Sequence, residues 1–192
     1  MNVQSPPKMN FEEFMRWGPR QDRKYELVRG VPAMLPWVRL KHSRIVMALV
    51  QTIGPQLKGT EYELADAEFA LRTGEDSSRF ADLLIIPAGL PGDTPHIDDA
   101  IVVVEVLSPS TQHNDFGPKR EEYLGLESLD TYLVFDADEP RVWQWTRNED
   151  GGFAIEPIIL EDRDAAVELS RLGVMVPLAD IYSDLAGVRS DP

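Results

Sequence analysis

Two carboxylates lie inside apolar segments of the chain, where side chains of this type are costly to bury. Asp82 begins the segment Ala-Asp-Leu-Leu-Ile-Ile, and Glu105 lies within Ile-Val-Val-Val-Glu-Val-Leu. If the two segments form neighbouring strands, their acids lie roughly 5 Å apart, which is one strand spacing and allows one divalent cation to contact both. The chain has no Cys and only three scattered His. Hard oxygen ligands therefore favour Mg²⁺ or Mn²⁺ over zinc.

A third group of polar residues follows Glu105 at helical spacing. Asp115, Lys119 and Tyr123 are four residues apart and share one face of a predicted helix. A helix that packs back over the preceding strand would direct the Lys119 ammonium group into the same pocket as Glu105. The alternative is an exposed ion pair between Asp115 and Lys119, which contributes only about 0.3–0.5 kcal/mol.

A purely structural role for the two acids is the competing interpretation. A buried carboxylate needs a hydrogen bond, an ion pair or a cation to offset its lost hydration. Asp82 could instead be partly solvated at the start of its strand. Glu105 would then pair with one of three basic residues: Arg79, Lys119 or Arg120.

The elements that must position these residues mix strands and helices without regular alternation. Helices are expected at residues 11–17, about 41–57 and about 115–126, with a short one after Pro177. Strands are expected at residues 25–29, 31–35, 62–72, 80–86, 101–107, 131–135, 141–146, 153–159 and 174–176. The nearly continuous apolar runs at 80–86 and 101–107 suit central strands buried on both faces. The predicted fold class is α/β or α+β, a mixed central sheet flanked by helices.

Length and composition indicate a single domain. The chain has 192 residues, of which 43% are hydrophobic and 27% charged. We expect this domain to span residues 10–186, with flexible ends at 1–9 and 187–192. Residues 1–9 lack the apolar segment of a signal peptide, and every apolar run is far shorter than the ~20 residues that cross a bilayer. A cytoplasmic protein without a membrane partner is expected, and the absence of Cys is compatible with that compartment.

The charge of the chain is unevenly distributed. The formal net charge is −14, which opposes tight binding to nucleic acid. However, residues 1–60 carry ten Lys and Arg against four Asp and Glu, so this segment is net +6 and the remainder is net −20. This asymmetry indicates either a basic face for a polyanion or an uneven solvated surface. Trp143 and Trp145 alternate on one strand of a late, acidic hairpin, where the local charge favours core or dimer packing over base stacking.

These residues together resemble a known family. The shared features, in order, are Tyr-Glu-Leu-Val-Arg-Gly at 25–30, the helix start His42-Ser-Arg-Ile-Val, the Asp82 strand, Val-Glu-Val-Leu-Ser-Pro-Ser-Thr at 104–111, the residues Asp115, Lys119 and Tyr123, and Tyr132-Leu-Val-Phe-Asp. Over residues 25–182 they resemble the Uma-type restriction-endonuclease-like family of the PD-(D/E)xK nuclease superfamily. The resemblance implies a restriction-endonuclease-like fold and a Mg²⁺-dependent site for phosphodiester hydrolysis.

The resemblance also implies roles for individual residues. Asp82 and Glu105 match the two motif acids and would bind the metal together with the Val106 carbonyl. Glu26 matches the N-terminal acid of the family, and Lys119 would orient the attacking water and stabilise the transition state. Two further residues would contact a substrate phosphate: His42 and Tyr123.

The sequence departs from the superfamily pattern at three positions. Ala81 replaces the Pro that normally precedes the motif Asp, which only shapes the entry to the strand. Leu107 occupies the usual lysine position, as is common in this family, in which the helix lysine takes over the role. Arg29 stands where the family usually has an acid.

The leading functional hypothesis is a Mg²⁺- or Mn²⁺-dependent DNA endonuclease, with a homodimer placing two sites on two strands. One alternative is a catalytically silent nuclease fold that binds nucleic acid or regulates, which the net charge of −14 supports. Another is a structural domain for a protein partner, which would show no stabilisation by metal.

Overall fold

The structure is a computed structural model of the chain, and it describes residues 8–107 and 115–183. The predicted ends lie largely outside these residues, as do motif residues 108–111 and His113. Within the described residues, no helix combines the length and apolar character that a membrane crossing requires.

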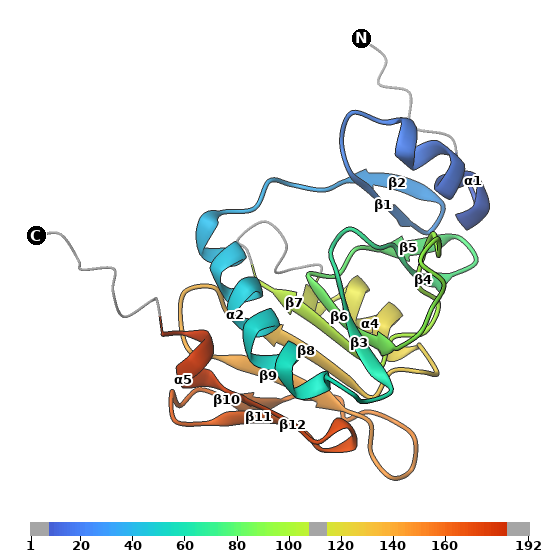
Figure 1. Cartoon of the computed structure of the whole chain (residues 1–192). Helices are drawn as coiled ribbons and strands as arrows, with labels where there is room; N and C mark the ends of the chain where they lie inside the picture. Colours follow the sequence, from blue (N-terminus) through green and yellow to red (C-terminus); the bar gives the residue numbers. More distant parts are fainter. Residues whose placement is uncertain (1–7, 108–114, 184–192) are drawn as a thin grey trace, which may run out of the picture.

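The central element is a mixed six-stranded sheet with the order β10-β9-β8-β7-β6-β3 (Figure 1). Its strands are β3 (Tyr62–Asp66), β6 (Leu83–Pro87), β7 (Val102–Val106), β8 (Thr131–Phe135), β9 (Val142–Thr146) and β10 (Ile158–Leu160). Strands β7 and β8 pair in parallel, whereas the other pairs are antiparallel. Strands β6 and β7 are direct neighbours, as the sequence predicts.

Helices cover both faces of this sheet. Helix α2 (Leu40–Leu57) buries Ile45, Leu49 and Ile53 against one face, because these residues recur at helical spacing. Helix α4 (Pro118–Leu124) contributes Tyr123 to the apolar cluster on the other face. The predicted mixed sheet with flanking helices is therefore confirmed.

A second sheet lies beside the central one, at the upper right of Figure 1. Its order is β2-β1-β5-β4, and its strands are β1 (Tyr25–Val28), β2 (Val31–Met34), β4 (Leu71–Gly74) and β5 (Ser77–Arg79). Helix α1 (Phe11–Trp17) lies against it and begins with a capping box, in which Asn10 and Glu13 exchange hydrogen bonds. A hairpin of β11 (Ala166–Leu169) and β12 (Val174–Pro177), followed by α5 (Leu178–Ile181), completes the described chain.

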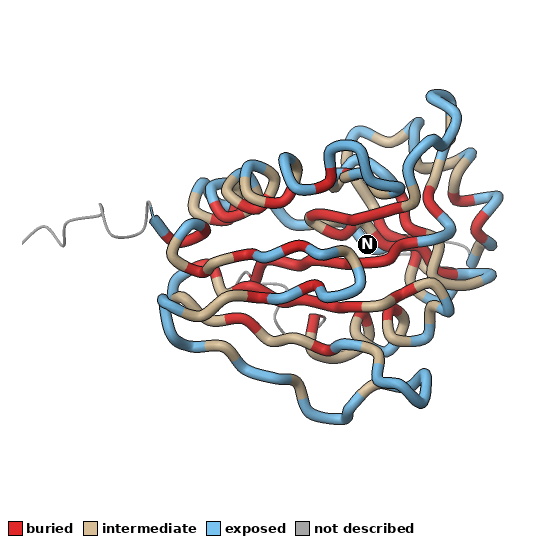
Figure 2. Tube along the Cα trace, turned by 60° about the horizontal axis from the view of Figure 1, so that its bottom comes forward, coloured by how far each residue is buried: buried red, intermediate tan, exposed pale blue. Residues whose placement is uncertain are grey.

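Burial follows the predicted pattern in the two central strands. All five residues of β7 and four of the five in β6 are buried, and Figure 2 shows buried strands enclosed by exposed loops. The side chains of a strand alternate between faces. Glu105 therefore lies on the same face as Val103, which belongs to the apolar cluster of α4.

Some predicted elements differ from the structure. The single strand expected at 62–72 is two strands, β3 and β4, in different sheets. They are separated by a turn in which Asp66 accepts hydrogen bonds from the amides of Glu68 and Phe69. The strand expected from residue 153 starts at Ile158, and the sequence analysis did not predict β5 or β11. The named helix α4 is shorter than the predicted 115–126, since Gly117 and Pro118 interrupt its start.

Candidate active site

The carboxylate of Asp82 is held at the C-terminal end of strand β7. Asp82 directly precedes β6, and its Oδ2 accepts a hydrogen bond of 2.7 Å from the Val106 amide. His42 on α2 places its Nε2 3.0 Å from the same oxygen. These contacts position Asp82 next to Glu105, although its side chain remains 16% exposed.

Glu105 is buried and is bound by two donors from helix α4. Its Oε1 accepts hydrogen bonds from Lys119 Nζ at 2.9 Å and from the Tyr123 hydroxyl at 2.7 Å. Burial raises the pKa of Glu105 well above its usual range, the Lys119 charge opposes this shift, and the nearby Asp82 charge adds to it. Additional positive charge near Glu105 would therefore stabilise its ionised form.

Lys119 is the cation at the centre of three carboxylates. Besides Glu105, its Nζ lies 3.4 Å from Asp115 Oδ1 and 3.6 Å from Glu26 Oε1. Burial alone would lower the pKa of Lys119, but the charges of these carboxylates raise it above its ordinary value. Lys119 is 4% exposed. The exposed ion pair considered as an alternative is therefore not what the structure contains.

A second ion-pair cluster supports Glu26 from strand β5. Arg79 Nη1 lies 3.1 Å from Glu26 Oε2, and the Phe80 amide donates to Glu26 Oε1 at 3.2 Å. The same guanidinium binds Glu122 through Nε and Nη2 at 2.8 and 2.6 Å, and the Thr73 hydroxyl also donates to Glu122. Arg79 thus joins strand β1 to helix α4 through two carboxylates.

The roles of Arg79 and Glu122 are not predicted from the sequence. The sequence offers Arg79 only as a partner of Glu105, whereas in the structure its partners are Glu26 and Glu122. The available signal was a basic residue directly before the apolar run at 80–86 and an acid one helical turn after Lys119.

Substitution of Glu122 by Gln should destabilise the protein by about 1–3 kcal/mol, because the bidentate acceptor of the buried Arg79 is lost. Chemical denaturation measures this difference. Glu121→Gln is the matched control, since Glu121 is exposed and lies 3.9 Å from an exposed Arg29. Equal stability of the two variants would contradict a structural role for the Arg79–Glu122 pair.

The site as a whole carries an excess of negative charge. Its carboxylates are Glu26, Asp82, Glu105, Asp115 and Glu122, and its permanent cations are Arg79 and Lys119. Within residues 8–107 and 115–183, no three His, Cys, Asp or Glu side chains gather in a geometry that could hold a metal ion. A Mg²⁺ ion does not need such a cage, because it usually binds one or two carboxylates and substrate phosphates and keeps several waters. The pair Asp82 and Glu105 fits this donor set.

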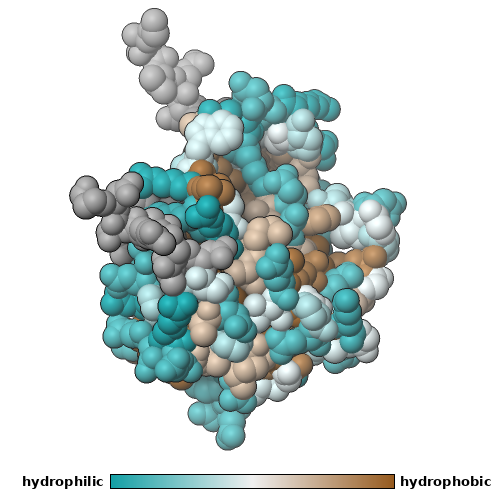
Figure 3. Space-filling view, turned by 60° about the vertical axis from the view of Figure 1, so that its left-hand side comes forward, coloured by the Kyte–Doolittle hydropathy of each residue, from teal (hydrophilic) through white to brown (hydrophobic). Residues whose placement is uncertain are grey.

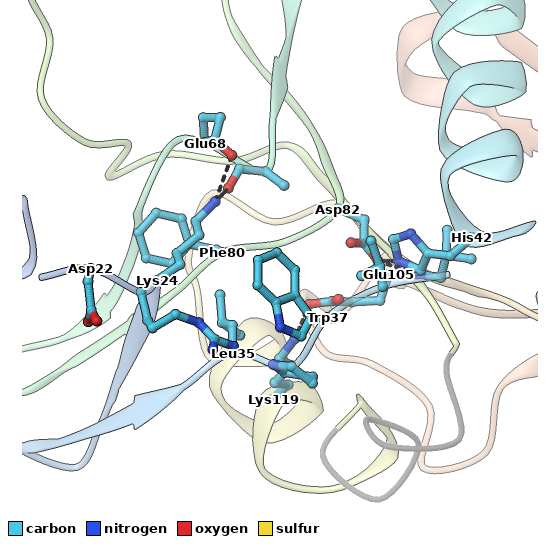
Figure 4. Close-up of a pocket in the computed structure, with 15 residues that line it drawn as sticks. Asp22, Lys24, Leu35, Trp37, His42, Glu68, Phe80, Asp82, Glu105 and Lys119 are labelled. Atoms are coloured by element: carbon cyan, nitrogen blue, oxygen red, sulfur yellow. Dashed lines mark hydrogen bonds and ion pairs between the residues drawn. The ribbon is translucent and has the colours of Figure 1, made fainter. Parts of the chain in front are cut away.

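Both acids line one cavity of about 370 Å³. Val106, Lys119 and His42 line it as well, and Figure 4 shows the labelled side chains around it. A volume of this size is sufficient for a small-molecule ligand. The arrangement thus presents two hard oxygen ligands and a buried cation to a molecule that enters the cavity.

The structure brings most of the predicted site residues together. One cavity is lined by five of them: Asp82, Glu105, Val106, Lys119 and His42. Glu26 lines an adjoining cavity together with Lys119. Tyr123 is fully buried, and its hydroxyl donates to Glu105. The contact of His42 and Tyr123 with a phosphate remains a prediction.

A comparison with family models identifies the family of the chain. Residues 11–176 match the family model described as "Uma2: Putative restriction endonuclease", which covers most of the chain. The chain belongs to this family. The matched range includes α1, both sheets and every candidate site residue named above.

Individual relatives extend the comparison. The chain is 27% identical over 183 residues to the uncharacterized protein slr1290 of Synechocystis sp., and the alignment covers 94% of each chain. It is also similar to the crystal structure of "a putative nuclease belonging to DUF820" from Anabaena variabilis, with a TM-score of 0.72 and 18% identity. That similarity covers 92% of this chain and 99% of the Anabaena chain. At this level of identity the structural match establishes the shared fold.

Proposed function

We propose that this protein is a Mg²⁺- or Mn²⁺-dependent endonuclease that hydrolyses phosphodiester bonds in DNA. Membership of the family supports a nuclease function. The observation that carries the proposal is the pair of carboxylates from adjacent strands, Asp82 and Glu105, on one cavity with the buried Lys119.

We assign two roles to the residues of the site: metal binding and stabilisation of negative charge on the phosphate. Asp82, Glu105 and the Val106 carbonyl would hold the cation, with Glu26 supporting the site from the far side of Lys119. A bound cation supplies Lewis acidity and positive charge for a phosphodiester in the cavity. Lys119 would orient the attacking water and stabilise negative charge that develops on the phosphate.

The hydrogen bonds to Glu105 support its assignment as a metal ligand. Among the described residues, Lys119 and Tyr123 both donate to Oε1. Oε2 is therefore the oxygen through which Glu105 would bind a cation. The two donors fix the carboxylate in one orientation, which lowers the reorganisation needed when metal binds.

The proposal predicts metal-dependent nicking of supercoiled plasmid DNA. Wild type should nick with Mg²⁺ or Mn²⁺ and stop when EDTA is added, and Asp82→Asn should be slower by about 100-fold because one charged ligand is lost. Asp93→Asn, a change at an exposed loop residue, is the matched control and should retain wild-type rates. All three proteins are purified identically to exclude a contaminating nuclease.

Equal nicking by wild type and Asp82→Asn would overturn the proposed site. Absence of nicking by every variant, with DNA binding retained, would favour the alternative of a silent nucleic-acid-binding module. The overall charge of −14 slows association with a polyanion, so it counts against a nuclease and favours a regulatory module without turnover.

We also propose a homodimer, since two copies could address the two strands of a duplex. Sedimentation equilibrium of the full chain measures the mass directly. A single species of 21.6 kDa at all accessible concentrations would contradict it.

A further inference from the structure

An exposed tryptophan lies at the mouth of the cavity that contains the acids. Trp37 is in the linker between β2 and α2, is 81% exposed, and lines the same cavity as Asp82 and Glu105. Met34, Val38 and Leu40 nearby are each more than half exposed. Figure 3 shows the face that carries α2, where apolar surface lies among hydrophilic side chains. An exposed apolar patch that continues into a functional cavity indicates a binding surface.

The cavity also carries two pairs of a cation and an aromatic ring. The Arg23 guanidinium lies 4.6 Å from the ring centroid of Trp37, and Lys24 Nζ lies 4.4 Å from that of Phe80. All four residues line the cavity, and Figure 4 shows Trp37, Lys24 and Phe80 around it. An aromatic ring with a cation on one face can stack a nucleobase on the other.

Two further cavities adjoin this one through shared lining residues. A cavity of about 470 Å³ shares Arg23, Lys24 and Phe80 with it. Another, of about 530 Å³, shares Leu35, Pro36 and Lys119. We call these three adjoining cavities the groove, and together they offer room beside the acids for a ligand longer than one nucleotide.

The depth of the acids favours a flexible strand as the ligand in this groove. Glu105 is 3% exposed and Lys119 is 4% exposed. Duplex DNA is stiff over roughly 150 base pairs, so bringing its phosphate to a buried group requires local distortion. An unpaired strand can bend into the groove and also exposes the faces of its bases.

The charges near the groove favour stacking over phosphate contacts as the source of affinity. Of the cations that line the groove, Lys24 pairs with Glu68 and Lys119 is surrounded by carboxylates. Cations that are already neutralised contribute little to counterion release. Base stacking on an exposed aromatic ring needs no such charge.

We propose that this groove binds an unpaired stretch of nucleic acid with a base stacked on Trp37, so that single-stranded or locally unpaired DNA is preferred over continuous duplex. The inference deepens the proposed nuclease function and rests on it for its biological meaning. Binding itself does not require hydrolysis, so the two can fail separately.

Fluorescence anisotropy in EDTA tests the proposal without cleavage. The probes are labelled (dT)₂₀, the same strand paired with (dA)₂₀, and an abasic oligonucleotide of equal length. Wild type should bind (dT)₂₀ more tightly than either other probe. Trp37→Ala should weaken binding of (dT)₂₀ by about 5- to 150-fold, which corresponds to the loss of one stacked base.

Ile155→Ala is the matched control, because Ile155 is 85% exposed, like Trp37, but lines none of the three cavities. It should bind (dT)₂₀ like wild type. Equal affinity of Trp37→Ala and wild type for (dT)₂₀, or tighter binding of duplex than of (dT)₂₀, would overturn the proposal. If plasmid nicking is absent but Trp37→Ala still weakens (dT)₂₀ binding, the proposed hydrolysis fails and the groove assignment stands.

Discussion

Replacement of Glu105 by Gln should lower metal-dependent DNA cleavage by about 10²–10³-fold while changing the free energy of unfolding by less than about 1 kcal/mol. The amide keeps the shape of the side chain and an oxygen that can accept from Tyr123. Lys119 keeps two of its three carboxylates, Glu26 and Asp115. The lost negative charge is the one that would hold the cation, so activity and stability should separate.

Cleavage rates and calorimetric titration with Mn²⁺ measure the functional part of this prediction, and urea denaturation in EDTA measures stability. The variant should show weak or no Mn²⁺ binding. The matched control is Glu63→Gln, an exposed carboxylate on β3, which should leave all three measurements unchanged. Wild-type cleavage by Glu105→Gln would exclude Glu105 as a metal ligand.

The sequence was sufficient to predict the central sheet and the acids that it positions. Strands β6 and β7 are short apolar runs, and a carboxylate inside such a run is conspicuous because its burial is costly. The i, i+4 spacing of Asp115 and Lys119 also predicts a shared helix face, and in the structure the two lie 3.4 Å apart in a buried site. These features are local in the sequence, which is why they could be found.

The parts that were missed depend on contacts between distant segments. The Arg79–Glu122 pair joins residues 43 positions apart, and no spacing rule predicts such a contact. Strand β5 has three residues, too few to show a pattern. Trp37 was not singled out because its exposure is a property of the folded chain.

The two late tryptophans illustrate the same distinction. Trp145 is 2% exposed and stacks against Tyr132 at 5.5 Å, whereas Trp143 packs edge-on against Phe116 at 4.9 Å. The acidic charge of their hairpin favoured packing over base stacking, and packing is what the structure shows. By contrast, the burial of Lys119 among three carboxylates could be recognised only from the folded structure, because two of the three acids come from other elements.

Replacement of Lys119 by Met should destabilise the protein by about 3–5 kcal/mol, because three carboxylates lose the buried cation that faces them. Methionine has a similar length and can fill the space of the aliphatic stem. Urea denaturation in EDTA measures the loss. Lys58→Met, at an exposed residue after α2, should leave stability within about 0.5 kcal/mol of wild type.

A divalent cation should recover part of this stability if it binds at Glu105. Mn²⁺ supplies positive charge beside the uncompensated acids, so it should raise the melting temperature of Lys119→Met more than that of wild type. Cleavage should remain low even at saturating Mn²⁺, since the group that stabilises the transition state is missing. Equal shifts in both proteins would argue against metal binding at these acids.

The double variant Lys119→Met/Glu105→Gln separates charge repulsion from lost packing. Removal of Glu105's charge takes away one of the three uncompensated carboxylates, so the double variant should be more stable than Lys119→Met alone. Lost packing around the lysine stem would be unaffected by Glu105→Gln, and the two changes would then be additive. A favourable coupling energy therefore identifies the Lys119–Glu105 ion pair as the interaction that lets the fold keep a carboxylate ready for a cation.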